Sequence, residues 1–210
     1  MSRTLALELF ERGIRDERVL WAIAQVERRL FVPPALRLEA DDDRPLPIGH
    51  DQTISQPYVT ARMTEELGLR GGEKVLEVGT GSGYQTALLS LLAGQVLSME
   101  VVPDLAARAA EVLLGALALE NVRLRVGDGT LGWPEEAPFD RVLVTAAPEE
   151  VPEALFAQLA PGGRMVVPVG PADRVQELLS VEKGEGGRMS VREVLPVRFV
   201  PLVPGRPAVH

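Results

Sequence analysis

The feature that most constrains the fold is a regular alternation of strand-like and helical segments between residues 74 and 170. Apolar, strand-like runs occupy 74–78, 95–101, 122–128, 139–146 and 164–170. Helical stretches lie between several of these runs, at 84–94, 103–118 and 151–159. Such alternation is typical of right-handed βαβ units, which place their strands in one parallel sheet. The sequence therefore predicts an α/β protein with helices on both faces of a mostly parallel sheet.

The segments that flank this core have different patterns. Residues 4–30 show helical spacing of apolar side chains, and a helix is also predicted over 56–67. The stretch 31–57 is rich in proline and acids and has no clean period, so we expect an ordered loop there. Near the C-terminus, 176–183 and 189–202 are strand-like and are joined by a glycine-rich turn. This pattern predicts an antiparallel strand near the end of the sheet.

The composition excludes several classes of function. A formal net charge of −8 argues against nucleic acid as the main partner, because such affinity depends on cationic contacts to phosphates. The chain has no cysteine, so thiol nucleophiles and cysteine-ligated metals are excluded. No segment approaches the ~18 to 20 apolar residues of a membrane span, and the charged N-terminus is unlike a signal peptide. We expect a cytoplasmic protein with no membrane partner.

The sharpest motif is EVGTGSG, which lies between a predicted strand and a predicted helix. Its glycines Gly79, Gly81 and Gly83 form the pattern GxGxG. In the dinucleotide-binding fingerprint GxGxxG the third glycine would fall at position 84, which is Tyr84 here. A nicotinamide cofactor is therefore disfavoured. A glycine-rich turn still allows a ligand to approach the bare backbone and its amide donors.

Three acids lie at the predicted carboxyl ends of the first three strands, where open α/β sheets bind ligands: Glu77, Glu100 and Asp128. Glu100 follows Gly79 by 21 residues, close to the ~20 expected for an acid that binds a ribose diol. Each acid alone is equally compatible with a strand end, a helix cap or a turn. Together they would repel a pyrophosphate but suit a ribose, an amino group and a sulfonium, which favours S-adenosylmethionine.

These motifs resemble those of class I S-adenosylmethionine-dependent methyltransferases, which have a Rossmann-like fold. Further segments resemble the protein-L-isoaspartate O-methyltransferase family, namely FVP at 31–33, PLPIGHDQTIS at 45–55, VLEVGTGSGYQTA at 75–87, the stretch 127–170 and VRFVPL at 197–202. The resemblance covers most of the chain. We accordingly expect a single domain over 1–210, with a helical preamble and substrate loop at 1–55, a Rossmann-like core at 56–202 and a frayed tail at 203–210.

The resemblance implies a protein repair enzyme. It would transfer a methyl group from S-adenosyl-L-methionine to the free α-carboxylate of L-isoaspartyl residues in damaged proteins or peptides, releasing S-adenosyl-L-homocysteine and using no metal. It assigns the active-site residue as Ser55 and places Thr53, Ile54 and Val200 at the isoaspartyl pocket. The expected cofactor site comprises Glu77, Gly79, Gly81, Gly83, Glu100, Gly127 and Asp128.

The sequence departs from the family's usual GHGQTISAPHM, since it reads GHDQTISQPYV and so differs at Asp51, Gln56, Tyr58 and Val59.

The sequence leaves three alternatives open, namely a class I methyltransferase with another substrate, a nicotinamide-dependent oxidoreductase and an inactive binding module. We expect a monomer. We also expect His50 to bond nearby backbone and the N-terminal helices to form a lid that excludes water.

Overall fold

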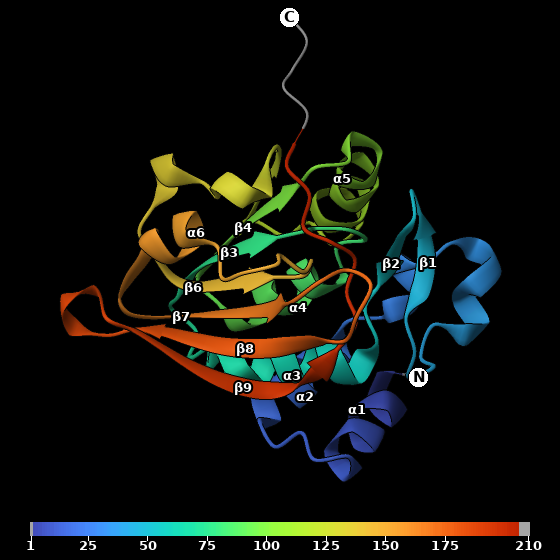
Figure 1. The fold of residues 1–210 in the computed structure, drawn as a ribbon. Coiled ribbons are helices and arrows are strands. Elements are labelled where there is room, and N and C mark those ends of the chain that lie inside the picture. The colour runs from blue at the N-terminus through green and yellow to red at the C-terminus, as the bar shows by residue number, and fades with distance from the viewer. Residues whose placement is uncertain (1, 206–210) are drawn as a thin grey trace, which may run out of the picture.

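The computed structural model describes residues 2–205, and its centre is a seven-stranded sheet in the order β5-β4-β3-β6-β7-β8-β9 (Figure 1). The strands are β3 Lys74–Val78, β4 Gln95–Glu100, β5 Val122–Val126, β6 Phe139–Val144, β7 Leu159–Val169, β8 Gln176–Lys183 and β9 Met189–Val197. Strands β3 to β7 are paired in parallel, whereas β8 is antiparallel to both of its neighbours. The predicted mostly parallel sheet with an antiparallel strand near the C-terminus is confirmed.

Helices cover both faces of the sheet because successive strand residues point to opposite sides. Val75 and Leu143 belong to a core under α3 (Pro57–Leu67), α4 (Tyr84–Leu92) and α5 (Pro103–Ala110). Helix α5 continues as a π-helical turn over Glu111–Ala116. Leu76 and Val142, which are next to Val75 and Leu143 in the chain, point to the other face of the sheet. They belong to a second core under α6 (Glu153–Ala157) and the 3-10 helices Gly129–Leu131 and Pro134–Glu136.

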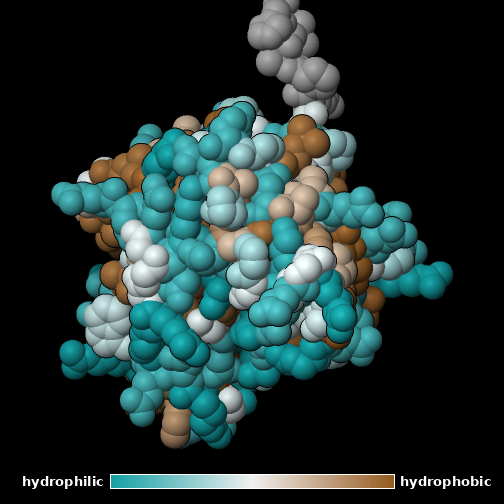
Figure 2. Space-filling view, turned by 90° about the vertical axis from the view of Figure 1, so that its left-hand side faces the viewer, coloured by the Kyte–Doolittle hydropathy of each residue, from teal (hydrophilic) through white to brown (hydrophobic). Residues whose placement is uncertain are grey.

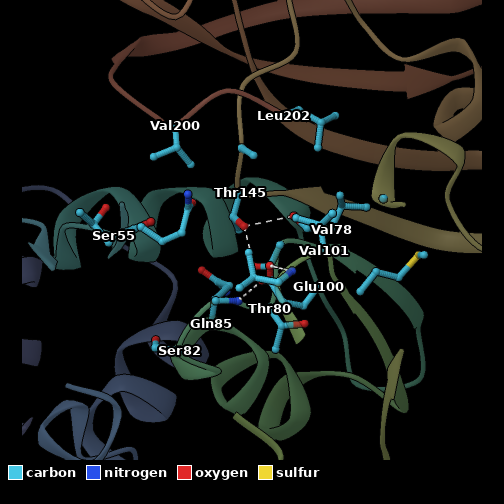
Figure 3. A pocket seen from close by; sticks show the side chains of 18 of the residues that line it. Ser55, Val78, Thr80, Ser82, Gln85, Glu100, Val101, Thr145, Val200 and Leu202 are labelled. Atoms are coloured by element: carbon cyan, nitrogen blue, oxygen red, sulfur yellow. Dashed lines mark hydrogen bonds between the residues drawn. The ribbon is translucent and has the colours of Figure 1, made fainter. Parts of the chain in front are cut away.

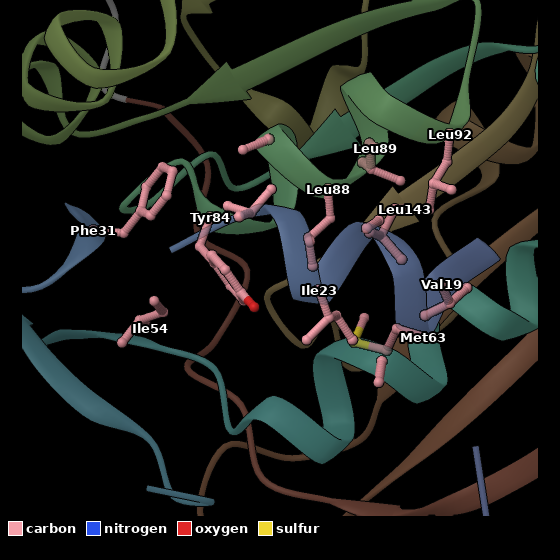
Figure 4. Close-up of a cluster of buried hydrophobic side chains, with 14 of the residues drawn as sticks. Val19, Ile23, Phe31, Ile54, Met63, Tyr84, Leu88, Leu89, Leu92 and Leu143 are labelled. Carbon is pink, nitrogen blue, oxygen red and sulfur yellow. The ribbon is translucent and has the colours of Figure 1, made fainter. Parts of the chain in front are cut away.

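The N-terminal preamble forms an additional layer on the first of these faces. The predicted helical stretch is divided into α1 (Ser2–Glu11), α2 (Glu17–Gln25) and a 3-10 helix over Arg28–Phe31. The carboxylate of Asp16 caps α2 by accepting bonds from the amides of Arg18 and Val19. Side chains of α2 meet α3 and α4 in one buried cluster that includes Val19, Ile23, Met63, Leu88 and Leu92 (Figure 4). These helices belong to the core, and their expected role as a lid over the site stays a prediction.

The stretch 31–57 is more regular than the sequence suggested. It contains a 3-10 helix over Pro34–Glu39 and a hairpin of β1 (Leu46–Gly49) and β2 (Gln52–Ile54). The two residues between the strands, His50 and Asp51, have φ values of 53° and 56°. Positive φ at both central residues is the requirement of a type I′ turn, which suits the twist of a two-residue hairpin. The expectation of a loop is therefore wrong for residues 46–54.

After β9, the C-terminal segment passes along the edge of the sheet at which the parallel strands end. A short parallel bridge pairs Pro201 with Ala147. The amide of Ala147 donates to the carbonyl of Val200, and the amide of Leu202 donates to the carbonyl of Ala147, both at 2.8 Å. Residues 203–205 have no regular secondary structure, and the rest of the expected frayed tail lies outside the described residues.

Figure 2 shows the side of the molecule from which the turn between β8 and β9 projects, and this surface is largely hydrophilic, with hydrophobic side chains in separate areas. The turn between β8 and β9, which includes a 3-10 helix over Glu185–Gly187, projects from this side (Figure 1).

Within residues 2–205, no helix combines the length and the apolar character that crossing a membrane requires.

Candidate active site

A cleft lies at the carboxyl ends of β3, β4 and β6 (Figure 3). Five segments that are distant in sequence line much of it, at 52–55, 78–82, 99–102, 145–146 and 200–203. Parallel strands bring their carboxyl ends to one edge of a sheet, so this is where an open α/β sheet places its ligand site.

The glycine-rich turn forms the floor of the cleft. Gly79 has a φ of 99°, and a Cβ there would collide with Oγ1 of Thr145. This Thr145 hydroxyl is close because it donates to the carbonyls of Gly79 at 2.7 Å and Val78 at 3.1 Å. The turn is also fixed from β4, since the amide of Gly79 donates to the carbonyl of Met99 at 2.8 Å. Only glycine meets both the conformational and the steric requirement at this position.

Glu100 is the acid that lines the cleft. Its side chain is nearly buried, with 6% of its surface exposed. One carboxylate oxygen accepts a bond from the amide of Gly81 at 2.7 Å, and the other accepts from the amide of Val102 at 3.0 Å. Each oxygen keeps further acceptor capacity, because a carboxylate offers about four lone-pair sites. Glu100 can therefore accept bonds from two ligand hydroxyls while it holds the glycine turn.

Glu77 lies behind the wall of the cleft and not among the residues that line it. It is fully buried, and its Oε2 accepts from the hydroxyls of Thr86 at 2.5 Å and Ser98 at 2.6 Å. Its Oε1 has no hydrogen-bond partner among the described residues. The pKa of Glu77 is raised to about 7, chiefly by burial and also by the nearby charge of Glu100, while the two hydroxyl bonds act in the opposite direction.

Gly83, Gly127 and Asp128 also stand outside the lining of the cleft. A Cβ on Gly83 would press on Leu113, so this glycine allows α4 to pack closely against the helix that follows β4. The amide of Gly127 donates to the carbonyl of Glu100 at 2.9 Å. The Asp128 carboxylate accepts from the amide and hydroxyl of Thr130, at 2.9 and 2.6 Å. These three residues therefore support neighbouring segments and do not line the cleft themselves.

The residues expected to bind the substrate come together at one end of the cleft. Ser55, Thr53 and Val200 line both the cleft and an adjoining depression, the side groove, which Tyr58, Val59, Leu195 and Phe199 also line. Ile54 faces the cleft and is 4% exposed. Figure 3 shows Ser55 at one side of the cleft and Val200 above it, with Thr145 between Val200 and the glycine turn. Ser55 therefore stands where the cleft meets the side groove.

Two of the departures from the family pattern have a structural explanation. Oδ1 of Asp43 accepts from the amide of Tyr58 at 2.9 Å, and Oδ2 accepts from the side-chain amide of Gln56 at 2.7 Å. The same carboxylate pairs with Arg12, whose guanidinium lies 4.5 Å from the centroid of the Tyr58 ring. Gln56 thus ties the start of α3 to the segment before β1, and Tyr58 ties it to Arg12, directly after α1. Nothing in the structure explains Val59.

Several residues of the cleft were missed by sequence reasoning. Thr145 was given no role, although it lies in the family-like stretch 127–170, and it reaches the cleft because β6 ends there. Residues 201 and 202 belong to the family-like segment VRFVPL, and they reach the cleft because the chain returns past Ala147. His50 also differs from expectation, since its Nε2 lies 3.4 Å from a carboxylate oxygen of Asp104 and not against backbone.

Within residues 2–205, no three His, Cys, Asp or Glu side chains converge in a way that could hold a metal ion.

The sheet order, the glycine turn after β3 and the acid at the end of β4 define the class I methyltransferase fold. A model of the protein-L-isoaspartate(D-aspartate) O-methyltransferase family matches residues 2–206. The chain therefore belongs to the protein-L-isoaspartate(D-aspartate) O-methyltransferase family.

Similar proteins agree with this assignment. The protein-L-isoaspartate O-methyltransferase of Anaeromyxobacter dehalogenans strain 2CP-C is 65% identical over 100% of both chains. That of Myxococcus xanthus is 58% identical over 95% of this chain and 94% of the relative. One solved protein-L-isoaspartate O-methyltransferase is 31% identical with a TM-score of 0.85, covering 96% of this chain and 65% of that longer chain. A Plasmodium falciparum protein assigned to the same enzyme, solved with S-adenosyl-L-homocysteine, is 26% identical with a TM-score of 0.82, covering 96% and 98%.

Proposed function

We propose that this chain methylates the free α-carboxylate of L-isoaspartyl residues in damaged proteins and peptides, using S-adenosyl-L-methionine as the methyl donor. The observation that carries the proposal is the place of Ser55, at the junction of the Glu100 cleft and the side groove. A donor bound in the cleft and a peptide bound in the groove would meet at this residue. Membership of the family supports the same reaction.

The residues of the cleft fit the donor. The bare backbone of Gly79 and Gly81 leaves room for the methionine part, and Glu100 has acceptor capacity for a ribose diol. Met99 and Leu202 line the cleft as well and offer an apolar surface for a purine. When bound, the donor supplies a methyl group on a positively charged sulfur. Glu77 and Asp128 would act indirectly, because they hold neighbouring segments in place.

The reaction requires little acid–base chemistry from the protein. A substrate carboxylate with a pKa near ~3.9 is already ionised at neutral pH, so no general base is needed. The protein's task is to align the reacting atoms and exclude water, which in well-oriented reactions contributes roughly 7 to 11 kcal/mol. In this proposal the hydroxyl of Ser55 donates a hydrogen bond that orients the substrate carboxylate. Ile54 and Val200 present apolar surface beside it.

Replacing Ser55 tests this function at the residue that carries it. Ser55→Ala should lower kcat/KM for an L-isoaspartyl peptide by roughly 10- to 100-fold, since a hydrogen bond to a charged group is lost. Binding of S-adenosylmethionine, measured by calorimetry, should stay unchanged. Ser190→Ala on the exposed part of β9 is the matched control and should behave as wild type. Undiminished turnover in Ser55→Ala would contradict the assigned role.

We further propose that the protein acts in the cytoplasm as a monomer, without a nucleic-acid or membrane partner. The net charge of −8 supports the absence of a nucleic-acid partner. Sedimentation at several concentrations tests the monomeric state, which a concentration-dependent mass would exclude.

A further inference from the structure

Arg28 is a buried cation that the proposed chemistry leaves without a role. Its side chain is 0% exposed, and no carboxylate among the described residues forms an ion pair with it. Burial lowers the pKa of Arg28 to about 10, although Tyr84, Asp41 and Asp42 favour the charged form. Burying a charge is costly unless hydrogen bonds replace its water. The bonds that Arg28 makes therefore indicate why it is there.

Both terminal nitrogens of the Arg28 guanidinium donate to backbone carbonyls of the substrate loop, whereas its buried Nε has no hydrogen-bond partner among the described residues. One terminal nitrogen donates to the carbonyl of Ala40. The other donates to the carbonyl of Ser55 at 2.9 Å and to that of Arg44 at 3.3 Å. These acceptors span the segment that leads into the β1–β2 hairpin and the residue that follows the hairpin. A single side chain thus fixes both ends of the loop that presents Ser55.

Arg28 also lies near the helix that follows the glycine turn. Its guanidinium carbon lies 5.9 Å from the centroid of the Tyr84 ring, and this ring meets Phe31 edge-on at 5.5 Å. Figure 4 shows Tyr84 with Phe31 and Ile54 on one side of the buried cluster. Tyr84 is the first residue of α4, and it lines the cleft. Arg28 therefore lies between the backbone of Ser55 and the start of α4.

We propose that Arg28 is a positioning residue, which holds Ser55 at a fixed place relative to the glycine turn and so aligns the substrate carboxylate with the methyl donor. The proposal rests on the function proposed for Ser55. Lysine cannot replace arginine in this role, because a single ammonium does not present the planar fork that reaches separate carbonyls. The neighbouring Arg29 differs, since its side chain is half exposed and pairs with Glu27.

Arg28→Lys is the principal variant, and Arg29→Lys is its matched control. Arg28→Lys should lower kcat/KM for an L-isoaspartyl peptide by roughly 10- to 100-fold, the loss expected for one charge-assisted hydrogen bond. The affinity for S-adenosylmethionine should stay unchanged, because the glycine turn and Glu100 are intact. Arg29→Lys should match wild type in both measurements. Equal losses in peptide turnover and donor affinity in Arg28→Lys would indicate a general structural role and overturn the proposal.

A double-mutant cycle shows whether Arg28 acts through Ser55. In the Ser55→Ala background, Arg28→Lys should reduce turnover little further, since the hydroxyl to be positioned is absent. Full additivity of the two losses would overturn the proposal. In Arg28→Ala, free guanidinium at non-denaturing concentration should restore activity while the same concentration of sodium chloride should not. If Arg28→Ala does not fold, the cycle with Arg28→Lys decides alone.

A readout that is independent of activity separates this proposal from the proposed function. Amide hydrogen exchange in residues 52–56 should be faster in Arg28→Lys than in wild type, because the carbonyl of Ser55 loses its donor. Exchange in Arg29→Lys should equal that of wild type. Unchanged exchange in Arg28→Lys would contradict the positioning role. Lack of turnover by wild type would instead contradict the proposed function, even if the exchange result agrees.

Discussion

Glu77 and Glu100 end adjacent strands, yet their surroundings give the two carboxylates different tasks. Glu100 is held by two backbone amides and faces the cleft. Glu77 is fully buried beneath the turn and is held by two hydroxyls. Ser98 also contacts the hydroxyl of Thr80 at 2.6 Å, so Glu77 is linked to the glycine turn through one side chain. We interpret Glu77 as a support for the turn and Glu100 as the acid available to a ligand.

The buried Glu77 predicts a specific pH dependence of stability. Its pKa is raised from 4.5 to about 7 by burial, so between these values the folded protein binds more protons than the unfolded chain. The free energy of unfolding should therefore fall as the pH rises through this window and then level off. Glu77→Gln removes the titration. The variant should accordingly gain stability relative to wild type, by up to roughly 3 kcal/mol, on going from low pH to neutral pH.

Urea unfolding across this pH range tests the prediction. Glu120→Gln, at an exposed position, is the control for the loss of one negative charge. A stability difference between Glu77→Gln and wild type that does not change with pH would show that Glu77 does not titrate in this window.

Gly79 predicts the steric sensitivity of the turn. Gly79→Ala places a methyl group against Thr145 and forces alanine into a left-handed conformation. We expect a loss of at least about 2 kcal/mol in the free energy of unfolding, together with a loss of donor binding. Gly72→Ala is the control, because a Cβ there meets no atom within 4 Å. Equal stability of the two variants in urea unfolding would be inconsistent with the close approach of Thr145.

At the level of elements, the β1–β2 hairpin explains why Asp51 is tolerated where the family commonly has glycine. Asp51 has a φ of 56°, a conformation that glycine adopts freely and aspartate adopts more readily than most residues. Asp51→Gly should therefore raise the free energy of unfolding by about 0.5 kcal/mol, whereas Asp51→Val should lower it by about 1 to 2 kcal/mol. Thermal unfolding should show opposite shifts of Tm, and shifts of the same sign would argue against the left-handed turn.

The core elements could be predicted because their signals are local. β3 spans the residues expected of it, and the antiparallel pairing of β8 with β9 follows from the glycine-rich turn at 184–188. The hairpin was missed because its turn residues, His50 and Asp51, include no glycine or asparagine, so the positive φ values have no clear sequence signal. Such turns are recognised mainly by those residue types.

The orientation of side chains at the site could be predicted less well than their position along the chain. Spacing placed Glu77 and Gly83 beside the turn, but it could not show that one is buried beneath the turn and that the other faces Leu113. The role of Arg28 had no local signal either, because its acceptors lie 12 to 27 positions further along the chain. Such contacts depend on tertiary packing.

For the whole molecule, the N-terminal layer supports the segment that presents Ser55, and residues 200–203 line the cleft directly. The N-terminal layer buries apolar side chains against α3 and α4, and Arg28 reaches from it to Ser55. The C-terminal segment closes the opposite side, held by the bridge between Pro201 and Ala147. The proposed site therefore combines a cleft for the methyl donor at the edge of the sheet with the side groove, which we propose for the peptide.

The most direct test of this account is methyl transfer from labelled S-adenosylmethionine to a short peptide containing L-isoaspartate, measured beside the same peptide with normal aspartate. The two peptides differ only in which carboxyl group is free and in the length of the backbone, so charge and composition are matched. The account predicts methylation of the isoaspartyl peptide and none of the aspartyl peptide. Equal methylation of both peptides, or donor binding without transfer to either, would contradict it.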